Sequence, residues 1–295
     1  KTISDLASSY MSEKTKECIA NGVFTVGNYF FGGVGHIIID YDKAIRRGYK
    51  AIIQDAVEAL ESFDCNDPDF IQKTQFCKAI INFAKRYSDK AKEMAAVETN
   101  PTRKAELLQI AANCEKVPAN GATNFYEACQ SFIITQMILQ VESSGHSESP
   151  GRFDQYMYPY LEKDLASGAI TKDFAQELLD CVFVKLNDLN KVRDQISAQA
   201  FAGFQVFQNI GAGGQTEDGM DATNELSYMM METVAHLRLS APSFSILMNS
   251  FIVHVSLQDL VMVFLLCTTM KLLSQLLQTV EFLFMMPVVT VLSAV

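Results

Sequence analysis

The chain has 295 residues and a formal net charge of −10, a length that can bury one large core or two smaller ones. The acidic balance argues against nucleic acid or an anionic membrane as a partner. Seven scattered cysteines form no Cys-x-x-Cys pair, so a reduced cytoplasm suits the chain better than a disulfide framework or a zinc site.

Residues 42–141 predict helices, because apolar residues recur three and four positions apart. One apolar stripe runs through Ile45, Tyr49, Ile52, Ala56, Leu60 and Phe63. Two pairs place a capping residue before a proline suited to the first helical turn, namely Asp67-Pro68 and Asn100-Pro101. The apolar segment 122–142 predicts a helix that is buried on most sides.

The polar, glycine-containing stretch 143–152 predicts a loop, and Thr171 predicts the N-cap of a helix that reaches about residue 191. Residues 201–210 are predicted to form a buried strand that enters a glycine-rich loop, and residues 222–237 are predicted to form a further helix. The sequence therefore predicts a helix-rich α/β fold in which strands end in motif-bearing loops. Periodicity alone also allows an all-helical protein.

The motif GGVGHIIID has neither the lysine of a phosphate-binding P-loop nor the spacing of a dinucleotide fingerprint. Its His36, taken alone, is more typical of a structural histidine than of a catalytic one. The pair His146-Ser147 is equally open, because the serine can simply shape a turn. The four histidines show no metal-ligand spacing, so no metal site is predicted.

Three longer motifs lie in order along the chain. They are GNYFFGGVGHIIIDYDKAI, ESSGHSESPGRFDQYMYPY and AFAGFQVFQNIGAGGQTEDGMDATNELSY, at residues 27–45, 142–160 and 200–228. Together they resemble the glycyl radical enzymes, the superfamily of pyruvate formate-lyase and the radical dehydratases. The resemblance implies that residues 1–249 are an incomplete, N-terminal portion of the glycyl radical enzyme α/β barrel, and that the chain is also cut at its start.

The resemblance also implies site residues. At the place of His36, pyruvate formate-lyase is similar but carries an arginine, whose permanent bidentate cation a histidine cannot reproduce. An imidazole can instead give a proton to a departing hydroxyl near neutral pH. Asn28, His146 and Ser147 match positions that bind substrate hydroxyls in the cobalamin-independent glycerol and propane-1,2-diol dehydratases. Phe204 falls where those enzymes have a tyrosine, which removes one hydroxyl from the implied pocket.

These residues imply a lyase of the dehydratase type, which eliminates water or a similar leaving group from a small hydroxylated substrate by thiyl-radical chemistry. The resemblance implies no bound cofactor or metal. A separate S-adenosylmethionine-dependent activase would install the glycyl radical, and the intact enzyme would be a cytoplasmic homodimer. The alternatives are a formate C-acetyltransferase of the pyruvate formate-lyase type and a non-catalytic helical or membrane-associated protein.

Other polar residues of the motifs are predicted to be structural. Arg152 and Asp154 are predicted to form an internal ion pair. The pairs Gln208-Asn209 and Asn224-Glu225 are predicted to buttress the barrel.

Residues 250–295 form an apolar tail that matches nothing in the family pattern. Polar residues such as Asp259 interrupt the roughly 18 to 20 apolar residues that a membrane span needs. If the codons for residues 266–271 are read two bases later, they can encode Leu-Tyr-Asn-Asp-Glu, a motif that these enzymes carry shortly before the catalytic cysteine. One later position in the shifted frame does not agree with the family sequence. We therefore expect an out-of-frame tail and a chain without the thiyl cysteine, its glutamate base or the radical glycine. Such a chain is expected to be inactive by itself.

Overall fold

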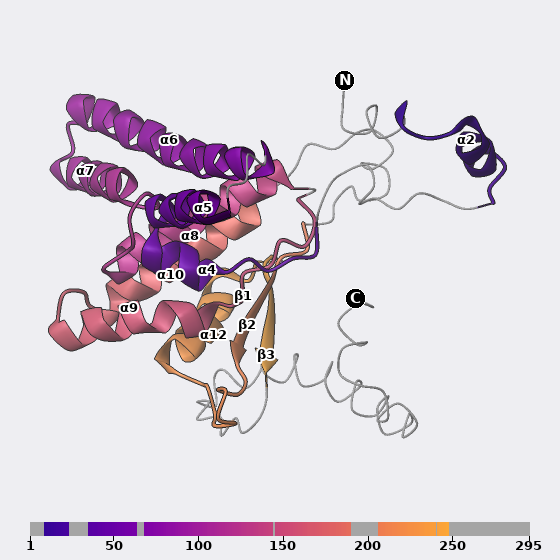
Figure 1. Ribbon diagram of the computed structural model, residues 1–295. Coiled ribbons are helices and arrows are strands. Elements are labelled where there is room, and N and C mark those ends of the chain that lie inside the picture. Colours follow the sequence, from indigo (N-terminus) through magenta and orange to yellow (C-terminus); the bar gives the residue numbers. More distant parts are fainter. Residues whose placement is uncertain are drawn as a thin grey trace, which may run out of the picture. The chain divides into compact units, whose positions relative to one another are not determined.

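The structure is a computed structural model that describes residues 9–23, 35–63, 68–143, 145–189, 206–239 and 241–247. Helices make up most of these residues, and a short parallel sheet lies beside them (Figure 1). The helices are α2 (Glu13–Ala20), α4 (Tyr41–Arg47), α5 (Tyr49–Phe63), α6 (Pro68–Val97), α7 (Pro101–Lys116), α8 (Phe125–Glu142), α9 (Phe153–Ser167), α10 (Lys172–Asp188) and α12 (Glu225–Leu237). The strands are β1 (Gly151–Arg152), β2 (Asn209–Gly213) and β3 (Ser243–Leu247). The helix-rich α/β prediction is confirmed, and the all-helical alternative is wrong.

Local capping signals place several helix ends. The Asn100 side chain accepts hydrogen bonds from the first turn of α7, and the Thr171 side chain accepts from Phe174 N at 3.2 Å. Both predicted N-caps are therefore confirmed. α6 begins at Pro68, as predicted, and Asp67 lies outside the described residues. α10 ends at Asp188, short of the predicted residue 191, because its C-cap Leu189 is already extended.

Gly48 divides the predicted apolar stripe between α4 and α5. Its φ of 75° and ψ of 162° lie in a region that is open essentially to glycine alone. The interruption lets Tyr49 N donate to Pro118 O at 2.8 Å, while Lys50 N donates to Ala119 O at 3.0 Å. The first turn of α5 is thereby joined to the loop that connects α7 and α8.

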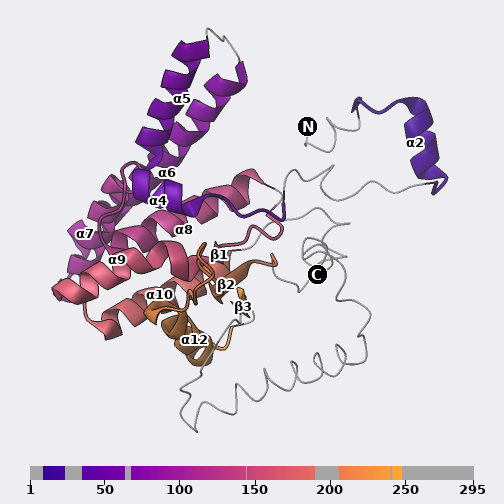
Figure 2. The same cartoon turned by 60° about the horizontal axis from the view of Figure 1, so that its bottom comes forward.

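The three strands are parallel and lie in the order β1-β2-β3. A bridge between Ile37 and Glu148 adds one more parallel contact just before β1. α9 and α10 lie between β1 and β2 in the chain, and α12 lies between β2 and β3. α9 and α12 both pack against β2, the central strand (Figure 2).

The main core lies where α8, α9, α10 and α12 meet β2. Alternate residues of β2, Ile210 and Ala212, are fully buried, which is the period expected of a strand with one face in the core. Aromatic rings fill the space between α4, α8 and α9: Phe132 lies 5.0 Å from Phe153 and 5.1 Å from Tyr41 between ring centroids. None of the helices in the described ranges is long and apolar enough to cross a membrane.

Asp154 ties α9 to β2 and α12. Its side chain is fully buried, and one carboxylate oxygen accepts from Gly213 N at 2.7 Å and from the Ser227 hydroxyl at 2.5 Å. Asn224, the N-cap of α12, donates to the Asp154 carbonyl at 3.3 Å. Arg152 instead donates to the backbone carbonyls of residues 213 and 215. The predicted Arg152–Asp154 ion pair is therefore wrong, because Arg152 bonds backbone carbonyls while Asp154 bonds Gly213 N and the Ser227 hydroxyl.

We expect Asp154→Ala to lower the free energy of unfolding by about 3 kcal/mol, because two buried donors lose their acceptor. Asp154→Asn keeps an acceptor oxygen and should cost less than about 1.5 kcal/mol. Urea unfolding followed by circular dichroism measures both values. Equal losses in the two variants would show that these hydrogen bonds are not what Asp154 contributes.

Candidate active site

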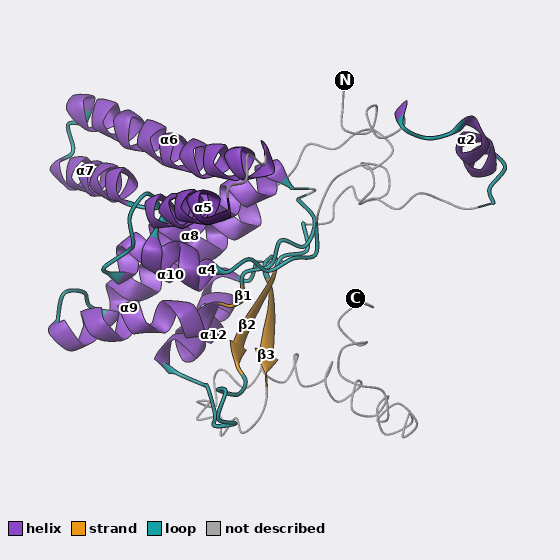
Figure 3. Cartoon of the chain, in the orientation of Figure 1, coloured by secondary structure: helices purple, strands orange, loops and turns teal. Residues whose placement is uncertain are grey.

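Backbone segments from all three motifs lie side by side at the amino ends of the strands, where the loops converge (Figure 3). The bonds that join them run from His36 N to His146 O (2.8 Å), from Ser149 N to Ile37 O (3.0 Å) and from Ser147 N to Val206 O (2.7 Å). These residues come before β1 and β2, so here the motif-bearing loops precede the strands. The predicted strand 201–210 is shifted toward the C-terminus, because residues 206–208 form a loop and β2 begins at Asn209 and includes Gly211 and Gly213. β2 then runs into the predicted glycine-containing loop at Gly214.

The two predicted histidines lie together. The ring centroids of His36 and His146 are 4.9 Å apart at an interplanar angle of 50°. The ring centroids of Phe207 and His146 are 5.0 Å apart. His36 is exposed and His146 is half-buried. Two imidazoles, one of them open to solvent, can therefore present hydrogen-bonding nitrogens to one small molecule.

Ser147 is buried beside this pair, and its backbone is left-handed. The φ angles of His36, Ser147 and Phe207 are 54°, 58° and 57°. Arg238 is the only other non-glycine residue with positive φ in the described part of the chain. Each such residue costs about 1 kcal/mol or more, and such strain concentrates at functional sites. His36, Ser147 and Phe207 thus lie in the same three segments that the sequence motifs indicated as the site.

The structure brings three of the five predicted site residues together, His36, His146 and Ser147. Asn28 and Phe204 lie outside the described residues, so their placement stays a prediction. The sequence reading missed Phe207 and Glu148. Glu148 is completely buried beside Ser147. In the sequence it is the one acidic residue between Glu142 and Asp154, and its place next to His146-Ser147 could have marked it as a candidate site residue.

A polar network lies behind the site. The Tyr41 hydroxyl donates to the Gln136 side chain, which in turn donates to the Glu148 carbonyl at 2.7 Å. Burial raises the pKa of Tyr41 well above its usual range, and the neighbouring Tyr49 and Glu148 add to this effect. Tyr41 is therefore a protonated donor at any physiological pH. The predicted buttressing role of Gln208 fits its bonds to Gln136 and to the Leu186 carbonyl.

The cysteines near the core are not activated nucleophiles. Burial raises the pKa of Cys114 to about 11 and raises the pKa of Cys129 further. Burial also raises the pKa values of Cys77 and Cys181. Thiols in such surroundings stay protonated and act as small apolar groups. Within the described residues, no three His, Cys, Asp or Glu side chains are placed to hold a metal ion together.

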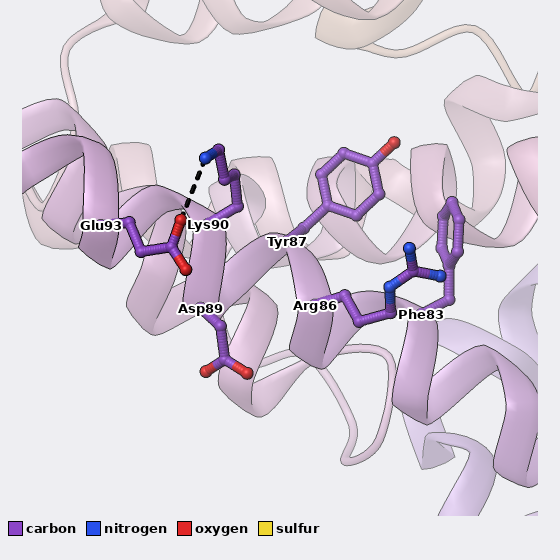
Figure 4. A pocket seen from close by; sticks show the side chains of 6 residues that line it. All are labelled: Phe83, Arg86, Tyr87, Asp89, Lys90 and Glu93. Carbon is purple, nitrogen blue, oxygen red and sulfur yellow. Dashed lines mark hydrogen bonds and ion pairs between the residues drawn. The ribbon is translucent and has the colours of Figure 1, made fainter.

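A surface hollow on α6 is separate from the histidine pair. Figure 4 shows its lining, which includes an ion pair of 3.0 Å between Lys90 and Glu93. The lining side chains are Phe83, Arg86, Tyr87, Asp89, Lys90 and Glu93. They come from one helix face, and none of the predicted site residues is among them.

Comparison with known proteins gives the family. The sequence matches the pyruvate formate lyase-like family over residues 1–268. The chain belongs to the glycyl radical enzyme family of pyruvate formate-lyase-like proteins. The match includes residues 250–268, so the expectation that the whole tail matches nothing in the family is wrong for these residues.

Several dehydratases are similar to this glycyl radical enzyme chain. The glycerol-bound B12-independent glycerol dehydratase of Clostridium butyricum is 51% identical, with a TM-score of 0.74 over 83% of this chain and 32% of that structure. A structure of 1,2-propanediol dehydration in Roseburia inulinivorans is 49% identical, with a TM-score of 0.75 over 83% of this chain and 30% of its own. The (2S)-3-sulfopropanediol dehydratase of Klebsiella oxytoca is 35% identical over 253 residues, which are 82% of this chain and 30% of that protein.

The chain spans about a third of the length of these relatives. The relatives are lyases and dehydratases of the glycyl radical type, and the aligned part is a portion of their barrel. The family and fold-class predictions are therefore confirmed.

Proposed function

We propose that this chain forms one wall of the substrate site in a glycyl radical lyase of the dehydratase type, which removes water or a similar leaving group from a small hydroxylated compound. The observation that carries the proposal is the His36–His146 pair beside buried Ser147, held on left-handed backbone. The 51% identity to a glycerol dehydratase supports it. A histidine at position 36 also disfavours a pyruvate formate-lyase activity, because it offers no permanent bidentate cation for a carboxylate.

The residues of this chain would bind the substrate and move one proton. Substrate hydroxyls would form hydrogen bonds with the side chains of His146, Ser147 and Asn28. These bonds would orient the reacting carbon. His36 would deliver a proton to the departing hydroxyl, as its exposed imidazole allows. Phe204 would line the same pocket without a hydrogen bond of its own. The glycyl radical, when installed, supplies hydrogen abstraction through a cysteine thiyl.

The remaining parts of the proposal concern partners. A separate S-adenosylmethionine-dependent activase would install the radical, and the intact enzyme would be a homodimer in the cytoplasm. Residues 250–295 would be an out-of-frame tail, as their apolar composition and the two-base codon shift indicate. Reading the DNA in all three frames checks this: another frame should stay open and continue into a Gly-Cys-x-Glu motif. If neither of the other two frames stays open, the tail proposal is removed.

The activity is tested on a full-length, in-frame gene, expressed with its activase under anaerobic conditions. Glycerol or propane-1,2-diol should give an aldehyde, which is measured by coupled reduction with NADH. The 295-residue chain, treated in the same way, should give no product. Formation of formate from pyruvate, with no aldehyde from either diol, would overturn the dehydratase proposal in favour of a formate-lyase activity.

A further inference from the structure

We propose that Gln136 is a positioning residue that holds the backbone of the candidate site in its left-handed conformation. The inference rests on the proposed function for its catalytic meaning. Gln136 lies on α8 and has no exposed surface. Glu148 is equally buried, and Tyr41 and Gln208 are each 1% exposed. An amide in such a place costs free energy unless all of its polar atoms are bonded.

Every polar group of this amide has a partner. Gln136 Nε2 donates to the Glu148 carbonyl and to Gln208 Oε1, both at 2.7 Å. Its Oε1 accepts from the Tyr41 hydroxyl. A flipped amide would set an oxygen against the Glu148 carbonyl, so one orientation is strongly preferred. Gln208 continues the chain by donating to the Leu186 carbonyl at 2.8 Å.

The two anchored residues each follow a strained one. Glu148 comes directly after Ser147, and Gln208 comes directly after Phe207. Ser147 and Phe207 have φ angles of 58° and 57°. Strained backbone persists only where the surrounding structure holds it. One side-chain amide therefore bonds the Glu148 backbone and the Gln208 side chain, the residues just beyond both strained ones, and so ties together the two segments that carry the site.

An apolar side chain of the same length could fill this place on α8. It could not specify how the two segments are placed relative to each other, because dispersion contacts lack direction. Bonds between satisfied polar groups in a low-dielectric core do carry direction. This difference separates a positioning role from simple core packing.

The test compares Gln136→Met with a matched glutamine variant in the isotopically labelled chain. Gln176 also has an amide with several partners, because its Nε2 donates to Met229 O at 3.2 Å and to the Thr233 hydroxyl at 2.8 Å. Those partners lie on α12, away from the His36–His146 loops. Gln176→Met therefore controls for the general cost of losing a bonded amide.

In Gln136→Met, hydrogen exchange at the Ser147 and Ser149 amides should accelerate about 10- to 100-fold, the value expected from losing the two bonds that Nε2 donates to Glu148 and Gln208. The imidazole NMR signals of His36 and His146 should also shift. Gln176→Met should leave both readouts at the native values. Equal changes in the two variants, or no change in Gln136→Met, would overturn the proposal.

If Gln136→Met does not fold, Gln208→Met decides, since it removes the bond between Gln136 and Gln208 together with the bond to the Leu186 carbonyl and leaves the Glu148 anchor. It should accelerate exchange at Ser147 about 3- to 10-fold, and exchange within twofold of native would overturn the proposal. These measurements need no substrate. A full-length enzyme that dehydrates no diol therefore removes the proposed function alone, whereas native exchange in the Gln136 variant removes only this inference.

Discussion

Gly48→Ala should destabilise the chain by about 4 kcal/mol, the sum of strained backbone and forced overpacking. A Cβ at residue 48 would lie 2.3 Å from the carbonyl carbon of Asn120 and 2.7 Å from Gly121 N. Backbone atoms cannot rotate away as a side chain can. The loop between α7 and α8 must therefore move, which breaks its bonds to Tyr49 and Lys50. Urea unfolding of the chain measures the loss.

Gly168→Ala is the matched control. Gly168 also has positive φ, at 69°, but a Cβ there meets nothing within 4 Å. Its substitution should cost only about 1 kcal/mol, the price of the left-handed C-cap. The difference between the variants isolates the steric clash from the backbone strain. Similar losses in both would show that α5 does not depend on this close approach.

Sequence reasoning worked where the cause is local. Asn100 and Thr171 cap their helices because a short polar side chain can reach free amides two or three residues onward, wherever the helix sits. It failed at Gly48, because the apolar stripe keeps its helical spacing across the break. α9 was not predicted either. It contains Pro159, a residue that disfavours a helix interior, and tertiary packing overrides this local preference.

The site could be predicted only in part, for a related reason. The family resemblance named His36, His146 and Ser147, but no local pattern states that residues 36 and 146 share a hydrogen bond. That bond depends on the parallel pairing of Ile37 with Glu148. The burial of Glu148 and the bonds of Gln136 likewise arise from long-range packing. Phe207 was missed because its left-handed backbone belongs to the junction with β2.

His36→Asn should lower kcat of the full-length enzyme by at least about 100-fold, the scale of lost general acid catalysis. Asparagine is chosen because it tolerates the left-handed φ of 54° at this position. The variant therefore removes the proton-donating imidazole without adding backbone strain. The KM for the diol should change by only about threefold, because His146 and Ser147 still bind the hydroxyls. Steady-state aldehyde release measures both constants.

His236→Asn serves as the control, since this histidine lies on α12 beside Asp180, at 3.4 Å between nitrogen and carboxylate oxygen. It should keep kcat within about twofold of the native value, as expected for a surface change. Glycyl radical content, measured by electron paramagnetic resonance, should be equal in all samples. A kcat loss with full radical content then belongs to the proton transfer. If His36→Asn turns over at the native rate, the leaving group departs without this imidazole, and His36 is retained only for the backbone that joins residue 36 to His146.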